Sequence, residues 1–334
     1  MTSTPDSNSA PPRRAAQWFT RDEIAALTAR SDWRGAWALL SNWAFVAAAF
    51  ALLALWPNAL TLVTALVIIA GRQLAFGILQ HEGAHGTLFN SRWMNRYLVD
   101  ALCARPVWQH LDKYRAHHLG HHARTGLDSD PDISLHRDYP VSRASLARKL
   151  LRDACGITGL KIMLGMILMD AGVFKWTVAN ELERLPQDGR RWWDYPITFL
   201  RNAWGMIAAN LALWAVLAAT GHGALYAVWA LAYITPLPLF VRIRSIAEHG
   251  CLERVDDMLR NTRTTQAGWL ARLTVAPVRV NYHLEHHALA AVPYYRLPQM
   301  HRLLRAKGLV SEPPSYWDVL RVASTPLHAA PLEA

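Results

Sequence analysis

Cysteine is scarce in this chain: only three of its 334 residues are cysteines. Cys103, Cys155 and Cys251 lie far apart and show none of the short spacings with which cysteines bind a metal. This scarcity excludes a disulfide-stabilised scaffold and a cysteine-ligated iron–sulfur cluster. We therefore expect three free thiols in a reducing compartment.

Charged residues are missing from four long stretches. Residues 36–56, 203–219 and 223–241 contain no Asp, Glu, Lys or Arg, and residues 59–80 contain only Arg72. A helix needs about 20 apolar residues to cross the ~30 Å hydrocarbon core of a bilayer. Buried helices of a soluble protein are the alternative, but four such runs seldom share one soluble domain. The sequence thus predicts four transmembrane helices.

Basic residues are also missing from the two turns, 57–58 and 220–223, that separate these runs in pairs. Lys and Arg gather instead in the N-terminal arm, in residues 92–201 and after Arg242. Because Lys and Arg favour cytoplasmic segments, we expect the turns outside and the basic segments inside. The predicted fold is all-α: an integral membrane protein with four transmembrane helices in two hairpins and a cytoplasmic helical cap. We expect an inner or cytoplasmic-type membrane, with both termini in the cytoplasm.

This charge bias accounts for most of the net charge of +10. No recognition motif accompanies the basic residues, so nucleic acid is not an expected partner. Residues 1–14 are polar and rich in proline, and we expect them to be disordered. Residues 15–323 are expected to form one membrane domain, followed by a C-terminal tail at 324–334. Thr20 and Glu23 have the spacing of a capping box at the start of an amphipathic helix.

Histidines, in contrast, are concentrated in three short segments, which we call the first, second and third boxes. The first box, "HEGAH", places His81 and His85 on one face of a helix that continues the second span. The second and third boxes both contain the pattern HxxHH, whose members also lie on one side of a helix. All three boxes share the predicted cytoplasmic face. The candidate ligands in the second and third boxes are His118, His121, His122, His283, His286 and His287, and a ninth is His249 after the fourth span.

Nine imidazoles on one side of a membrane predict a metal centre. Neutral imidazole binds zinc, copper, iron and nickel. Nine nitrogens exceed what one ion accepts, so two ions are expected. A ligating imidazole usually donates its other N–H to a carboxylate or a carbonyl. The carboxylates placed to accept it are Glu82, Asp128, Asp130, Asp132, Glu248 and Glu285.

The order HxxxH, HxxHH, HxxHH on four spans resembles the integral-membrane fatty acid desaturase and hydroxylase family. The likeness covers about residues 35–310 and includes "DSDPD" after the second box and "NYHLEHH" before "VPYYRLPQMHRLL". It implies that the eight box histidines are iron ligands and that His249 corresponds to an additional histidine near the last span. Some members carry Asn four residues before that histidine, where this chain has Ser245. Many continue the third box with Leu-Phe-Pro, where this chain reads "ALAAVP".

The resemblance also implies a chemistry. A centre of two non-haem iron ions would use O2 and two external electrons to oxidise an unactivated C–H bond in a lipid acyl or alkyl chain. Desaturation is favoured over hydroxylation because the first and third boxes resemble those of acyl-lipid desaturases, but both outcomes stay open. The electrons are expected from a separate ferredoxin or flavin-linked reductase.

Two other functions fit part of the pattern. "HEGAH" satisfies the zinc-protease signature HExxH, with His81 and His85 on zinc and Glu82 as the general base. Such an intramembrane metalloprotease leaves the second and third boxes unexplained. A metal transporter or sensor is not favoured, because transport calls for ligands at mid-membrane and no histidine lies within a predicted span.

Two sets of residues have no assigned function. Arg72 is costly inside a span unless it faces protein or water. Isolated histidines are interpreted as packed or surface residues, and these are His110, His136, His222, His301 and His328.

Overall fold

A computed structural model describes residues 17–325, and this part of the chain consists of helices and connecting segments. It contains three isolated β-bridges and no strand within residues 17–325. The all-α prediction is confirmed. The segment expected to be disordered at 1–14, most of the tail at 324–334 and His328 lie outside the described residues.

Four helical stretches are long and apolar enough to cross a membrane, and each overlaps one of the four predicted spans. Two of these helical stretches extend beyond the apolar runs into segments that contain polar residues. α3 continues past residue 80 to His85, and the fourth stretch continues past residue 241 to His249. These extensions carry three of the nine histidines. The helices in the four stretches are α2 (Asp32–Leu55), α3 (Ala59–His85), α7 (Asp194–Ala219), α8 (Tyr226–Ile234) and α9 (Pro236–His249).

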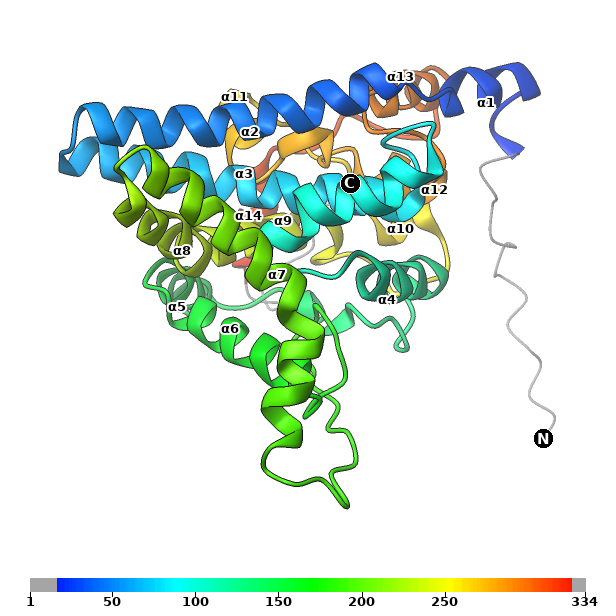
Figure 1. The fold of residues 1–334 in the computed structure, drawn as a ribbon. Coiled ribbons are helices and arrows are strands. Elements are labelled where there is room, and N and C mark those ends of the chain that lie inside the picture. Colours follow the sequence, from blue (N-terminus) through cyan, green and yellow to red (C-terminus); the bar gives the residue numbers. More distant parts are fainter. Residues whose placement is uncertain (1–16, 326–334) are drawn as a thin grey trace.

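The long helix α3 lies at the centre of the bundle, side by side with α2 (Figure 1). In the most apolar 18-residue segment of α3, 61% of the residues are buried, against 17% in the corresponding segment of α7. Most residues in that segment of α7 are therefore not buried. Asn58 begins α3 by accepting hydrogen bonds from backbone N–H groups that have no partner within the helix. Gly86 ends it with a left-handed conformation, φ 69°.

Arg72, the one charge in the second predicted span, has a structural role. Its Nη2 donates hydrogen bonds to the carbonyls of Arg272 at 3.2 Å and Leu273 at 2.9 Å. These carbonyls lie at the end of α11 (Trp269–Leu273), where they have no partner within the helix. A cation is favourable at a helix C-terminus. Arg72 therefore ties α3 to α11.

Residues 94–104 pack back along α3 as two short π-helices. Gly83 permits this contact, since a Cβ at that position would lie 2.7 Å from the side chain of Val99. Trp108, with a left-handed φ of 58°, then turns the chain toward α4 (Leu111–Arg124). The second box, on α4, thereby comes to lie against α3, which carries the first.

Shorter helices complete the fold. α12 (His283–Ala288) carries the third box and packs against α10 (Met258–Asn261) and α13 (Leu297–Ala306). The capping box expected from the sequence is confirmed: Thr20 Oγ1 accepts from the N–H of Glu23, whose carboxylate accepts from the N–H of Thr20. The remaining elements are α1 (Arg21–Thr28), η2 (Met94–Leu98), η3 (Asp100–Ala104), η4 (Arg105–Val107), η5 (Ile133–Leu135), α5 (Arg143–Ala154), α6 (Ile157–Asp170), η6 (Gly223–Leu225), α10 (Met258–Asn261), η7 (Pro277–Arg279), α13 (Leu297–Ala306) and α14 (Tyr316–Ala323).

Candidate metal centre

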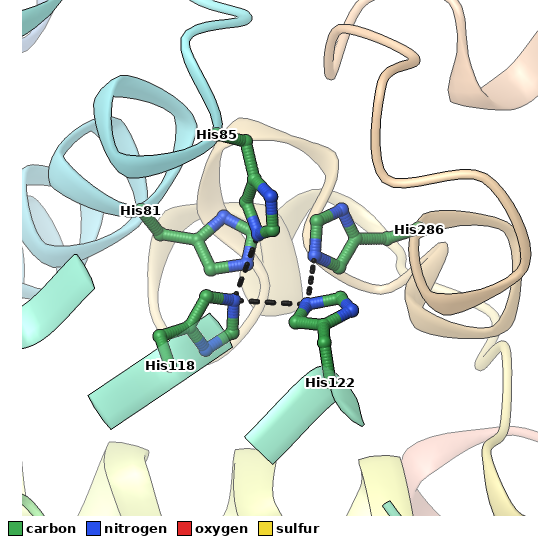
Figure 2. A group of neighbouring side chains, drawn as sticks. All are labelled: His81, His85, His118, His122 and His286. Atoms are coloured by element: carbon green, nitrogen blue, oxygen red, sulfur yellow. Dashed lines mark hydrogen bonds between the residues drawn. The ribbon is translucent and has the colours of Figure 1, made fainter. Parts of the chain in front are cut away.

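All nine histidines named from the sequence lie in two neighbouring groups. They come from α3, α4, α9 and α12, which are far apart in the chain. Within each group, one nitrogen per ring lies within 4.8 Å of the corresponding nitrogens of the others. Figure 2 shows the rings of the larger group turned toward one another. The five-histidine group is His81, His85, His118, His122 and His286, and the four-histidine group is His121, His249, His283 and His287.

The second and third boxes divide their histidines between the groups in opposite ways. In α4, His118 and His122 belong to the five-histidine group, and His121 belongs to the other. In α12 only His286 belongs to the five-histidine group. Because residues four apart share a helix face, each box offers a pair of rings to one group and a single ring to the other. The groups are adjacent: the rings of His122 and His287 stack with centroids 4.1 Å apart.

Inside the five-histidine group, ring nitrogens face ring nitrogens. His118 Nε2 lies 2.9 Å from His85 Nε2 and 3.0 Å from His122 Nε2. His286 Nε2 lies 2.9 Å from His122 Nε2. Neither nitrogen of the buried His81 ring has a hydrogen-bond partner. Hydrogen bonds do not satisfy such a cluster, because one proton serves only one contact between two nitrogens.

In the four-histidine group, most of the nitrogens that face outward have partners. His121 Nδ1 donates to Asp130 Oδ1 at 2.7 Å, and His249 Nδ1 donates to the carbonyl of Asn261 at 3.1 Å. A ring that donates through Nδ1 presents a bare Nε2 lone pair on its other side. His249 Nε2 lies 2.8 Å from His283 Nε2, inside the group. The lone pairs therefore converge on a common point.

The other two rings of this group are also supported from behind. His287 Nδ1 lies 3.3 Å from the hydroxyl oxygen of Thr125, whose own proton goes to the carbonyl of His121. His283 Nδ1 faces the Glu248 carboxylate at 3.5 Å, too poorly aligned for a hydrogen bond.

Burial keeps most of these imidazoles neutral. Burial, and then the neighbouring imidazoles, hold the pKa of His118, His122 and His286 well below the usual histidine range. The same causes lower the pKa of His283 and His287. Neutral imidazole is the form that binds metals.

His121 differs from these rings. Burial alone lowers its pKa, but the hydrogen bond to Asp130 and the charge of Asp132 outweigh burial and raise the pKa. A carboxylate behind a ligating imidazole fixes its tautomer and makes the ring a stronger ligand.

The nine histidines fit a pair of metal ions. Their donor atoms are all imidazole nitrogens, which suit iron, zinc, copper or nickel, whereas magnesium and calcium take oxygen ligands. Both nitrogens of the buried His81 ring and Nε2 of His287 have no partner. A buried nitrogen lone pair without a partner is costly unless a cation accepts it, and each neutral ring has one such lone pair. The division into five and four would offer each of two ions at least four imidazole nitrogens.

The acidic residues named from the sequence differ in their distance from the rings. Asp132 Oδ2 lies 3.8 Å from His121 Nδ1, and Glu82 Oε1 lies 3.7 Å from His81 Nδ1. The other oxygen of Glu82 accepts from the Thr87 hydroxyl at 2.8 Å. Of the six, only Asp130 makes a hydrogen bond to one of the nine candidate ligands within residues 17–325.

Two of the acidic residues face away from the site. The Asp128 side chain is 90% exposed and pairs with Arg254. Glu285 is fully buried and stands between two candidate ligands in the sequence. Its carboxylate accepts hydrogen bonds from the Thr264 hydroxyl and, at 2.7 Å, from His301 Nδ1. It joins the third box to α13.

Several residues at the site were missed by sequence reasoning. Asn261 takes part through its backbone carbonyl, which no side-chain pattern reveals. His136, interpreted as isolated, stacks on His249 with ring centroids 5.1 Å apart. His301 is buried against Glu285. The sequence could have indicated His117 as a residue near the site, because it stands next to His118 in a segment with four histidines among six residues.

A small cavity of about 10 Å³ touches both histidine groups. Such a volume holds roughly one water-sized group. Imidazoles from the two groups and mostly apolar side chains line it together. The lining residues are His81, His283, His286, Ile78, Val278, Val280, Leu297, Glu82 and Tyr294.

The family model for fatty acid desaturases matches residues 54–319, which is most of the chain and includes all nine histidines. A comparison with curated proteins gave no significant match. The chain belongs to the fatty acid desaturase family.

Membership of this family identifies the class of activity. Its members are oxidoreductases that generally oxidise lipid chains at a histidine-rich di-iron site, and both histidine groups could hold a metal ion. The four apolar helices agree with a membrane protein that acts on lipid. Such proteins usually require an electron donor.

Proposed function

We propose that this chain is an O2-dependent lipid desaturase in which nine histidines hold two iron ions. The observation that carries the proposal is the convergence of nine imidazoles, from four separate helices, into two adjacent groups. The ligands of one ion would be His81, His85, His118, His122 and His286, and those of the other His121, His249, His283 and His287.

The iron pair, when bound, would supply the oxidising power that an unactivated C–H bond requires, drawn from O2 and two external electrons. The protein's own contribution is to hold neutral, correctly turned imidazoles in a site that excludes water. Val278, Val280 and Leu297 line the small cavity together with rings of both histidine groups, Glu82 and Tyr294. These apolar side chains suit contact with a hydrocarbon segment.

Desaturation is our first choice and hydroxylation by the same centre the second. The first and third boxes resemble those of acyl-lipid desaturases, whereas the family match is compatible with either reaction. An intramembrane zinc protease using "HEGAH" is less well supported. It needs one ligand beyond His81 and His85, yet three further imidazoles belong to the same group.

We also propose that residues 15–323 form one membrane domain whose spans pair as two hairpins, with the boxes on the cytoplasmic side. The absence of Lys and Arg from both turns supports this orientation. All nine histidines would then lie just below the cytoplasmic leaflet. A lipid acyl or alkyl chain is the proposed substrate.

A separate electron donor, a ferredoxin or a flavin-linked reductase, completes the proposal. The chain's three cysteines fall short of the four thiolates that hold a ferredoxin-type cluster. The net charge of +10 favours an acidic donor.

Mass spectrometry of lipids from a host with and without the gene tests the proposed reaction. A lipid lighter by two hydrogens supports desaturation, and one heavier by an oxygen supports hydroxylation. His121→Ala and His286→Ala should each reduce the product below detection, whereas His222→Ala, an exposed histidine, should not change it. Unchanged lipids in the presence of an iron-loaded protein, or one zinc per chain in place of two irons, would overturn the proposal.

A further inference from the structure

His117 connects the protein surface to the four-histidine group. Its side chain is only 8% exposed, and its Nε2 donates to Asp132 Oδ1 at 2.7 Å. On the other side, its ring lies edge-on to the half-buried indole of Trp176, with centroids 6.1 Å apart. His117 belongs to neither histidine group.

From Asp132 the contacts continue to a candidate iron ligand. The backbone N–H of Asp132 donates to Asp130 Oδ1 at 2.9 Å, and the same oxygen accepts from His121 Nδ1 at 2.7 Å. The route Trp176–His117–Asp132–Asp130–His121 thus consists of one ring contact followed by hydrogen bonds.

The loop that presents Trp176 is held in place on both sides. Lys175 N–H donates to the carbonyl of Glu183 at 2.9 Å, which closes the loop on itself. Asn180 donates from its backbone and its side-chain amide to Ser134, close in the chain to Asp132. The position of the indole relative to His117 is therefore fixed by the loop.

We propose that Trp176 and His117 form the route by which electrons from a reduced one-electron protein carrier of the ferredoxin class reach the four-histidine site. This inference rests on the proposed function. In each transfer, one electron leaves the reduced carrier, which is oxidised, and one iron ion is reduced by one charge. No bond forms or breaks. Two such transfers provide the two electrons that the proposed reaction consumes.

One other ring contact could serve the same purpose. His136 is half-buried and stacks on His249. Its Nε2 is buried without a hydrogen-bond partner, so no chain of hydrogen bonds leads outward from it within the described part of the chain. The route through His117 is favoured because every step from its ring to His121 is a hydrogen bond.

The test is anaerobic stopped-flow reduction of the iron-loaded full-length protein, without lipid substrate, by a reduced [2Fe–2S] ferredoxin. Trp176→Leu and His117→Leu should slow oxidation of the ferredoxin at least about tenfold. Trp176→Phe, which keeps an aromatic ring, should recover most of the rate. Trp192→Leu, at an indole 76% exposed on the same segment, should match the wild type.

Two further measurements separate this route from a structural effect. The iron content of each variant should equal that of the wild type. Dithionite, a small reductant that needs no protein docking, should reduce all variants at the wild-type rate. Variants that lose iron or react slowly with dithionite would show that Trp176 and His117 support the fold, which overturns the route.

The remaining outcomes are also decisive. If the wild type holds iron that dithionite reduces, and Trp176→Leu accepts electrons from ferredoxin as fast as the wild type, the route is wrong and the proposed function stands. The same conclusion follows if only His136→Leu slows the transfer. If the wild type binds no iron, the proposed function fails and the route fails with it.

Discussion

The two histidine groups differ in what surrounds their rings. In the four-histidine group, three of the four Nδ1 atoms face a hydrogen-bond partner, and the fourth faces the Glu248 carboxylate at 3.5 Å. In the five-histidine group, no Nδ1 atom has a hydrogen-bond partner within residues 17–325, and the rings contact mainly one another. Surrounding residues therefore orient most rings of the four-histidine group. The five-histidine group lacks such partners, but it has one more ring that could bind a metal ion.

This difference suggests how the two sites would bind metal. A ligand whose outer nitrogen is fixed loses less freedom on binding and is a stronger donor. The four-histidine site therefore depends on each of its ligands and on the groups behind them. The five-histidine site has one ring more and less support, so the loss of one ring leaves it with four. Three experiments test this difference between the two groups.

The largest effect is expected from removing one ligand from each group on the same helix. His121→Ala leaves three ligands in its group, and we expect the iron content to fall by about one ion per chain. His122→Ala leaves four, and we expect both ions to stay, with weaker binding of one. Elemental analysis of the purified proteins measures this. A greater loss of iron from His122→Ala than from His121→Ala would contradict the comparison.

An intermediate effect is expected from the carboxylate behind His121. Asp130→Asn removes the charged acceptor, and the affinity of the four-histidine site for iron should fall by roughly 10- to 100-fold. Competition with a chelator of known affinity measures the change. Asp128→Asn is the matched control, because it makes the same substitution two residues away on a side chain that is 90% exposed. Equal affinities in the two variants would show that the hydrogen bond to His121 does not matter.

The smallest effect is expected from His301, which holds α12 through Glu285. His301→Ala leaves one oxygen of a buried carboxylate without its partner, and the free energy of unfolding should fall by about 1–3 kcal/mol. Because α12 supplies ligands to both groups, both should lose iron to a chelator faster and to a similar degree. Thermal unfolding in detergent and the kinetics of chelation measure these effects. Faster loss from only one group would mean that Glu285 positions individual rings and not the helix.

The sequence predicted the parts of this protein that follow from local chemistry. The four apolar runs were predicted as helices because a helix satisfies its backbone hydrogen bonds within itself, as lipid requires. Arg72 was the one charged residue within these runs. The capping box at Thr20 was predictable because both of its hydrogen bonds lie within four residues. Hydropathy alone did not predict the helix ends, because α3 and α9 stay helical where their residues become polar. The HxxxH spacing did predict that the second span continues as a helix to His85.

The clustering of histidines by itself selected the eight candidate ligands of the three boxes, since imidazoles this numerous and this regularly spaced have few uses other than metal binding, and the position of His249 after the fourth span added the ninth. Only the tertiary structure decided how they divide. Each HxxHH box gives a pair to one group and a single ring to the other, and the choice depends on how α4 and α12 are rotated against α3 and α9. The residues behind the rings, such as Thr125 and the carbonyl of Asn261, come from other parts of the chain, so packing and not sequence spacing brings them to the site.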